Sequence, residues 1–285
     1  MKAFVEPFVE MSGYADMMKT MSKGCGLISV TGCIDAQKPH MIYACNDGHK
    51  NKVIVTFHEQ KAKELLAEYA FFDENVVYYP AKDVLFYQSD IQGNVLTAQR
   101  IQALKAIMEQ ESVTVITTYD ALMNTMTPQE KLKSSVRVLK PGQEVDLEEL
   151  LASLVAMGYE KEYQVEARGQ YALRGGILDV FPLTEELPAR IEFWGDEIDT
   201  IRSFDVESQK SIESIAFLSV YPACELVLSQ QEKQEGIARL LKEAEHVSEE
   251  FRKEMKTEEA YRALSMAKTL AEEWGELAIS AGMDA

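Results

Sequence analysis

The sequence predicts a mixed α/β protein: a parallel-sheet α/β domain with a mainly antiparallel α+β domain inserted into it. In the first part, β-branched runs alternate with helical segments of about ten residues, which is typical of βαβ units. From 162 to 220, short alternating segments are typical of an antiparallel sheet with one wet face. We therefore expect residues 1–131 to form the first part of the α/β domain. Residues 132–219 are expected to form the inserted domain, and 220–285 to return to the α/β domain.

In the first part, each expected strand is a short apolar or β-branched run, and each expected helix has apolar residues at helical spacing. The expected strands are Gly26–Thr31, Lys52–Thr56, Asn75–Tyr79 and Val113–Thr117, and the expected helices are Glu59–Glu68 and Ala98–Gln110.

In the second part, Ser135–Leu139 alternates like a strand and stops before a Pro-Gly turn. A helix should follow, with Asp146 as its N-cap, Glu149 three residues on as in a capping box, and Gly158 at its C-terminal end. From about 230 the pattern is helical and acidic. The chain ends without a closing element, so we expect it to be a piece of a longer protein.

Charge and composition exclude several classes of function. There are 29 Lys and Arg against 47 Asp and Glu, a net charge of -18 that repels a phosphate backbone. No stretch approaches the ~20 apolar residues that span a bilayer, and no secretory signal is recognisable, so we expect no membrane association. The four cysteines form no disulfide framework, which fits a cytoplasmic protein.

A degenerate phosphate loop follows the first expected strand. A working loop needs G-x-x-x-x-G-K-[ST]. Gly32 and Lys38 stand at the right spacing, but Gln37 replaces the second glycine and Pro39 replaces the hydroxyl that binds magnesium. Proline offers neither a hydroxyl nor a backbone N–H. We therefore expect a vestigial, helicase-like P-loop that does not bind nucleotide.

Other candidate sites are weak. Cys25, Cys33, His40, Cys45 and His49 cluster, but their spacing matches no common zinc framework. No Ser/His/Asp spacing rises above chance. We therefore expect no metal site and no catalytic residues.

The most informative segment runs from 168 to 205. Side chains of a strand alternate between two faces, so Ile191 and Phe193 share a face with the parity of a core, while Arg190 and Trp194 share the other. Arg174 also has the parity of the non-core face. Exposed Trp and Arg are enriched at interface hot spots. On parity alone, an alternative stays open, in which Trp194 covers a core edge and the arginines pair with local acids.

The same segment resembles a run shared by bacterial transcription-repair coupling factors (Mfd) and the damage-recognition subunit UvrB. The resemblance rests on Arg168-Gly-Gln-Tyr-Ala-Leu-Arg174-Gly, on Asp179-Val-Phe-Pro182, and on Arg190-Ile-Glu-Phe-Trp-Gly-Asp-Glu-Ile-Asp-Thr-Ile-Arg-Ser-Phe-Asp205. Weaker similarity covers most of 1–220. The broken phosphate loop, and the short stretch between Phe86 and Arg100 that leaves little room for a DNA-gripping hairpin, favour the coupling factor.

The resemblance implies an N-terminal recruitment module, without catalysis, that binds UvrA through Arg174, Arg190 and Trp194. The longer parent would be an ATP-dependent DNA translocase, with ATP and Mg in its own motor and no cofactor in this part. RNA polymerase and duplex DNA would be bound by regions outside this sequence, and an intramolecular latch to the C-terminal region would autoinhibit the parent. We expect the chain to be a monomer.

Two alternative functions belong to other classes. The chain could be a nucleotide-binding fragment of a helicase-type ATPase that uses Lys38, or a module that binds damaged DNA directly. Nucleotide binding would distinguish the first from a recruitment module. The net charge of -18 argues against the second.

Overall fold

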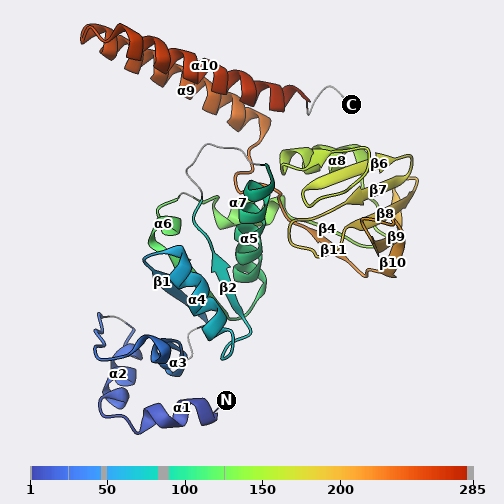
Figure 1. Ribbon diagram of the computed structural model, residues 1–285. Helices are drawn as coiled ribbons and strands as arrows, with labels where there is room; N and C mark the ends of the chain where they lie inside the picture. The colour runs from blue at the N-terminus through green and yellow to red at the C-terminus, as the bar shows by residue number, and fades with distance from the viewer. Residues whose placement is uncertain (1, 25, 46–49, 83–89, 125, 281–285) are drawn as a thin grey trace. The chain divides into compact units, whose positions relative to one another are not determined.

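The computed structural model describes residues 2–24, 26–45, 50–82, 90–124 and 126–280 (Figure 1). The chain divides into two compact units, Met1–Met126 and Thr127–Ala285. Each unit is described by itself.

The first unit is built on a parallel sheet of three strands in the order β1-β3-β2. The strands are β1 (Asn51–Thr56), β2 (Val76–Tyr79) and β3 (Val113–Thr118), and the helical segments are α1 (Lys2–Val9), α2 (Tyr14–Met21), the 3-10 turn η1 (Asp35–Gln37), α3 (Lys38–Ala44), α4 (Glu59–Tyr69), α5 (Asp90–Glu109) and α6 (Tyr119–Leu122).

Both faces of the central strand β3 are covered, and all six of its residues are buried. On one face, Leu65 and Tyr69 of α4 pack against Ile116. On the other, Ala103 of α5 packs against Val115. A strand that is covered on both faces needs a near-continuous apolar run, which explains the β-branched sequence of β3. The expected α/β layer of this part of the chain is confirmed.

The segment Gly26–Thr31 is not a strand, which corrects the sequence-based expectation. It makes no strand pairing among the described residues, and Leu27 and Val30 are exposed. An apolar β-branched run has strand propensity, but a strand forms only where a neighbour accepts its backbone hydrogen bonds. The stretch of sequence after Phe86 that we took as too short for a hairpin lies partly in 83–89, outside the described residues.

The second unit contains a six-stranded sheet in the order β10-β9-β8-β7-β6-β5, antiparallel except between β5 and β6. Its elements are α7 (Gln129–Ser135), β4 (Arg137–Leu139), α8 (Leu147–Ala156), β5 (Glu160–Lys161), β6 (Gln170–Arg174), β7 (Ile177–Val180), β8 (Ala189–Trp194), β9 (Glu197–Phe204), β10 (Ser211–Ser214), β11 (Leu218–Val220), α9 (Gln230–Lys253) and α10 (Thr257–Ser280).

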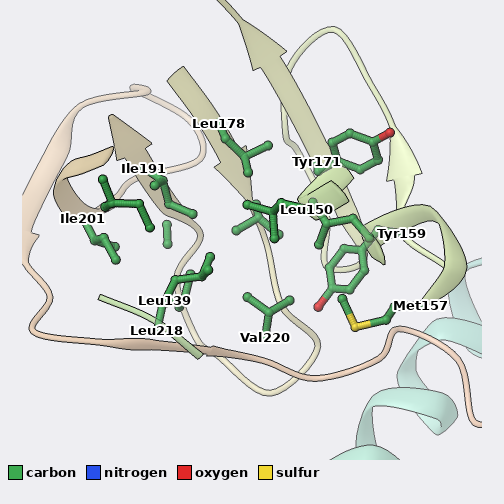
Figure 2. Packing of buried hydrophobic residues seen from close by; sticks show 14 residues of the cluster. Leu139, Leu150, Met157, Tyr159, Tyr171, Leu178, Ile191, Ile201, Leu218 and Val220 are labelled. Atoms are coloured by element: carbon green, nitrogen blue, oxygen red, sulfur yellow. The ribbon is translucent and has the colours of Figure 1, made fainter. Parts of the chain in front are cut away.

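The core of this unit lies between one face of the sheet, helix α8 and the two-stranded ladder of β4 and β11 (Figure 2). Leu150 comes from the helix, Leu178 and Ile191 from the sheet, and Leu139 and Leu218 from the ladder. These side chains are almost fully buried, which contributes roughly 1.5–3 kcal/mol each. The predicted mainly antiparallel domain is thus present as a sheet separate from the parallel one.

Helix α8 has the N-cap residue and the C-terminal glycine that the sequence predicts, and of the expected capping box the structure gives the hydrogen bond to Asp146. At its start, the Asp146 side chain accepts a hydrogen bond from the Glu149 backbone N–H at 3.0 Å. At its end, Gly158 has a φ of 85°. Its N–H donates to the carbonyl of Val155, and the N–H of Tyr159 donates to that of Leu154. This pair of hydrogen bonds is a Schellman motif, which needs a left-handed residue at the glycine position.

A β-bulge in β9 decides which of its residues face the core. Ile191 pairs with Ile201, but two residues later Phe193 pairs with Ile198, so Asp199 is the additional residue. Strict alternation would place Ile198 and Ile201 on opposite faces. The bulge lets both of them reach the core, where they are 0% and 1% exposed.

Helices α9 and α10 pack against each other as an antiparallel pair (Figure 1). Ser229 begins α9 with a capping box, in which its side chain and that of Glu232 each accept a hydrogen bond from the other's backbone N–H. Ala244, Ala260 and Ala267 are buried, and small side chains let two helices approach closely. The return of residues 220–285 to the α/β domain stays a prediction.

Candidate interaction surface

The sheet of the second unit has a second face, opposite the core of Figure 2, which we call the outer face. Its residues follow from the strand register, because directly paired residues point to the same side. The pairing Asp179 to Arg190 to Arg202 forms one row across three strands, and the row of Arg174, Ile177, Glu192 and Thr200 lies beside it. Trp194, paired with Glu197, follows at the end of β8.

A buried carboxylate joins the two predicted arginines. The Asp179 side chain is 0% exposed. Arg190 donates to it from Nε at 2.7 Å and from Nη2 at 2.9 Å, and Arg174 donates from Nη2 at 2.6 Å. Charge-assisted bonds of this length offset the cost of removing the carboxylate from water. The structure therefore brings Arg174 and Arg190 together around a single acid.

Two further contacts, with Phe204 and Gln209, hold the Arg190 side chain in place. Its guanidinium carbon lies 4.6 Å from the centre of the Phe204 ring, and its Nη1 donates to the carbonyl of Gln209 at 3.1 Å. The hydrogen bonds to Asp179 raise the pKa of Arg190 above its ordinary value, against the opposing effect of burial. The arginine therefore stays charged although only 16% of its side chain is exposed.

Trp194 is 83% exposed, so it does not cover a core edge. It is the last residue of β8, on the face opposite the core, and Gly195 turns the chain beyond it with a φ of 63°. It lies four positions after Arg190 along the strand, about 13 Å at roughly 3.3 Å per residue. Ile177, which is 36% exposed, and Glu192 lie in the row between Trp194 and Arg190, and Arg174 stands in the same row.

Asp179 is the functional candidate that sequence reasoning missed. A signal for it existed, because an acid stands inside the apolar strand Ile177–Val180. The strand register is what shows that it lies opposite Arg190. Parity within one strand could not show this, because it says nothing about which residue of a neighbouring strand stands opposite.

The vestigial phosphate loop is a turn leading into a helix. Gly32 has a φ of 83°, whereas Gln37 has a φ of −90° in the ordinary helical range. Lys38 begins α3, and its Nζ lies 2.6 Å from Oδ1 of Asp35. Pro39 is buried in the first turn of α3. A lysine paired with a carboxylate and a glutamine in helical conformation do not form the cradle of backbone N–H groups that a phosphate loop uses. The helicase-like detail of the expected fold stays a prediction.

Within the described ranges, no three His, Cys, Asp or Glu side chains gather as a metal would require. Cys33, Cys45 and Cys224 form no disulfide there, while Cys25 and His49 lie outside the described residues. No helix in the described part of the chain is long and apolar enough to cross a membrane.

Comparison with known proteins gives the class of this unit. Residues 138–226 match the model of the UvrB interaction domain family, a range that contains the whole outer face. This segment belongs to that family.

Similarity to known proteins also extends beyond this domain to most of the chain. The chain is 30% identical over 197 residues to the transcription-repair-coupling factor of Bacillus subtilis, covering 68% of this chain and 17% of that protein. It is 32% identical over 207 residues to the coupling factor of Staphylococcus aureus strain Mu50, covering 71% and 18%. It is also 31% identical over 228 residues to UvrABC system protein B of Thermosipho africanus, covering 75% and 34%. The chain is therefore a homologue of coupling factors and of UvrB, and it spans about a sixth of the former and a third of the latter.

Proposed function

We propose that this chain is a recruitment module that binds UvrA through the outer face of its UvrB interaction domain, by Arg174, Arg190 and Trp194. The observation that carries the proposal is the almost fully exposed Trp194 on the same sheet face as a fixed arginine pair. A large aromatic side chain that is exposed on a rigid strand leaves apolar surface in contact with water, which is unfavourable, and it contributes nothing to the core. Such a residue beside arginines is typical of a binding hot spot.

The charge of the face supports a protein partner with acidic groups. The whole chain has a net charge of -18, yet the two rows around Asp179 hold three arginines, Arg174, Arg190 and Arg202, against two acids, Asp179 and Glu192. A basic spot on an acidic molecule steers one orientation of approach and repels acidic surfaces elsewhere. The same overall charge disfavours DNA as the ligand of this chain.

The names of the relatives give the wider role. Two of the relatives are named as factors that couple transcription to repair, and one as part of the UvrABC system. On this basis the module would bring excision repair to stalled RNA polymerase. We propose that this chain itself is without catalysis. The contacts with RNA polymerase and duplex DNA, the ATP- and Mg-dependent motor, and the autoinhibitory latch would belong to other parts of a longer protein.

Titration calorimetry of the 285-residue chain with purified UvrA tests the proposal. Trp194→Ala should raise Kd by about thirtyfold or more, the effect of a lost hot spot of ~2 kcal/mol. Its Tm should change little, since an exposed substitution costs within about 0.5 kcal/mol. Tyr163→Ala is the matched control, because Tyr163 is 86% exposed in the same domain but not in the outer-face rows. Equal Kd values for both variants would refute the proposed surface.

A further inference from the structure

We infer that Asp179 is the positioning residue of the outer face, and that the three proposed binding residues divide the work: Arg174 and Trp194 make the direct contacts with the partner, whereas Arg190 acts indirectly by holding the fold of this face. The inference rests on the proposed function for the identity of the partner. The division of roles among these residues follows from hydrogen bonds and exposure.

The two arginines differ in how many of their donors are already used. Arg190 donates from all three guanidinium nitrogens, to both carboxylate oxygens of Asp179 and to the carbonyl of Gln209. Arg174 donates only from Nη2 to other described residues, and 39% of its side chain is exposed. A guanidinium carries five N–H donors, so Arg174 keeps most of them for a partner.

Arg190 also connects parts of the fold that the outer face depends on. Its guanidinium stacks on Phe204 at the end of β9 and holds the turn that contains Gln209, whose φ is 57°. The Gln209 amide in turn donates to the carbonyl of Val206 at 2.8 Å. Replacing Arg190 would remove two of the three arginine hydrogen bonds to the buried Asp179 carboxylate, a change that destabilises the fold itself.

Asp179 acts on the partner through Arg174. A free arginine on a strand would sample many rotamers, and each ordered rotamer-rich side chain reduces affinity when it is fixed only on binding. The 2.6 Å bond to a fully buried acid fixes Arg174 before the partner arrives. The Asp179 carboxylate also neutralises one of the two positive charges of Arg174 and Arg190, so the three side chains together carry about one positive charge. The apolar Ile177 lies beside them on the side of Trp194.

This arrangement fits a partner segment with a single carboxylate beside an apolar side chain. The carboxylate would accept two hydrogen bonds from the free edge of Arg174, and the apolar group would pack on Trp194 and Ile177. Two partner carboxylates would exceed the available positive charge.

A double-mutant cycle on Kd for UvrA tests the inference, with Arg174→Ala, Asp179→Asn and the two combined in the full chain. Arg174→Ala should weaken binding by tenfold or more while lowering Tm less than Arg190→Ala does. Asp179→Asn alone should weaken binding by a similar factor. In the Arg174→Ala background, however, Asp179→Asn should change Kd less than threefold, because its effect passes through the missing arginine. Equal factors in both backgrounds would show that Asp179 does not act through Arg174 and would overturn the inference.

Two measurements do not depend on UvrA. NMR relaxation of the arginine Nε–H groups should show Arg174 ordered in the unaltered chain and mobile in Asp179→Asn; an Arg174 equally ordered in both contradicts the positioning role. If Asp179→Asn does not fold, the arginines are compared directly. Arg190→Ala must then lower Tm by several degrees more than Arg174→Ala, and equal shifts refute the division. Failure of the unaltered chain to bind UvrA would contradict the proposed function. If the chain binds UvrA but Asp179→Asn changes Kd by the same factor with and without Arg174→Ala, only this inference is contradicted.

Discussion

Gly158 offers a quantitative test of the packing of the second unit. It has a φ of 85°, and a Cβ added there would lie 3.0 Å from both Cβ and Sγ of Cys224. Gly142 is a matched control with a φ of 79°, where the nearest atom to an added Cβ is Glu197 Oε1 at 4.0 Å. Alanine at either position destabilises the fold by roughly 1–2 kcal/mol, because its Cβ disfavours the left-handed backbone conformation. Only Gly158→Ala adds the cost of overpacking, roughly 1–3 kcal/mol.

The expected free energy of unfolding is therefore lower by about 1–2 kcal/mol for Gly142→Ala and by about 2–5 kcal/mol for Gly158→Ala. For a unit of this size each kcal/mol shifts Tm by roughly 2–4 °C. Thermal and urea unfolding followed by circular dichroism would measure both variants. In a Gly158→Ala background, Cys224→Gly should be less damaging than in the unaltered chain because it removes the clashing atoms. Equal destabilisation at the two glycines would refute the reasoning.

Three further predictions concern other parts of the chain. Ser248 is 1% exposed and its hydroxyl has no hydrogen-bond partner among the described residues, so Ser248→Ala should raise the free energy of urea unfolding by about 1 kcal/mol; a loss would show that the hydroxyl is satisfied. The hydrogen bond from Lys131 lowers the pKa of Glu232 from 4.5 to about 2. The ionised Glu232 therefore contributes fully to the free energy of unfolding above pH 4.5, and this contribution disappears as the pH falls toward 2. The stability difference between the unaltered chain and Glu232→Gln should shrink over that range, and a constant difference would contradict the pairing. Millimolar Mg-ATP should give no saturable heat in calorimetry, whereas Gln37→Gly combined with Pro39→Thr could restore weak binding; micromolar affinity of the unaltered chain would overturn the vestigial interpretation.

The sequence predicts the outer face well because parity within β8 is a local property. Ile191 and Arg190 lie on opposite faces as alternation requires, and the N-cap Asp146 and the C-terminal Gly158 of α8 depend only on nearby residues. Local rules of this kind need no knowledge of which segments meet in space.

Features that depend on a distant neighbour could not be predicted. Asp179 became visible as the partner of two arginines only through the register of β6, β7 and β8. The bulge at Asp199 is set by the fit of β9 against β8, and no local pattern indicates it. The apolar run Gly26–Thr31 has the composition of a strand, but its exposure shows that composition does not supply a neighbouring strand.

The short ladder of β4 and β11 has a mechanical consequence. Arg137, where the chain enters the ladder, pairs with Val220, where the chain leaves the ladder, and Leu139 pairs with Leu218 at its other end. A force that pulls the flanking chain in opposite directions therefore acts on a single rung at a time, so the ladder unzips instead of shearing. Three rungs opened one after another resist far less tension than three loaded together. Opening the ladder would expose the buried Leu139 and Leu218 and would break none of the hydrogen bonds around Asp179, which lie on the other face of the sheet.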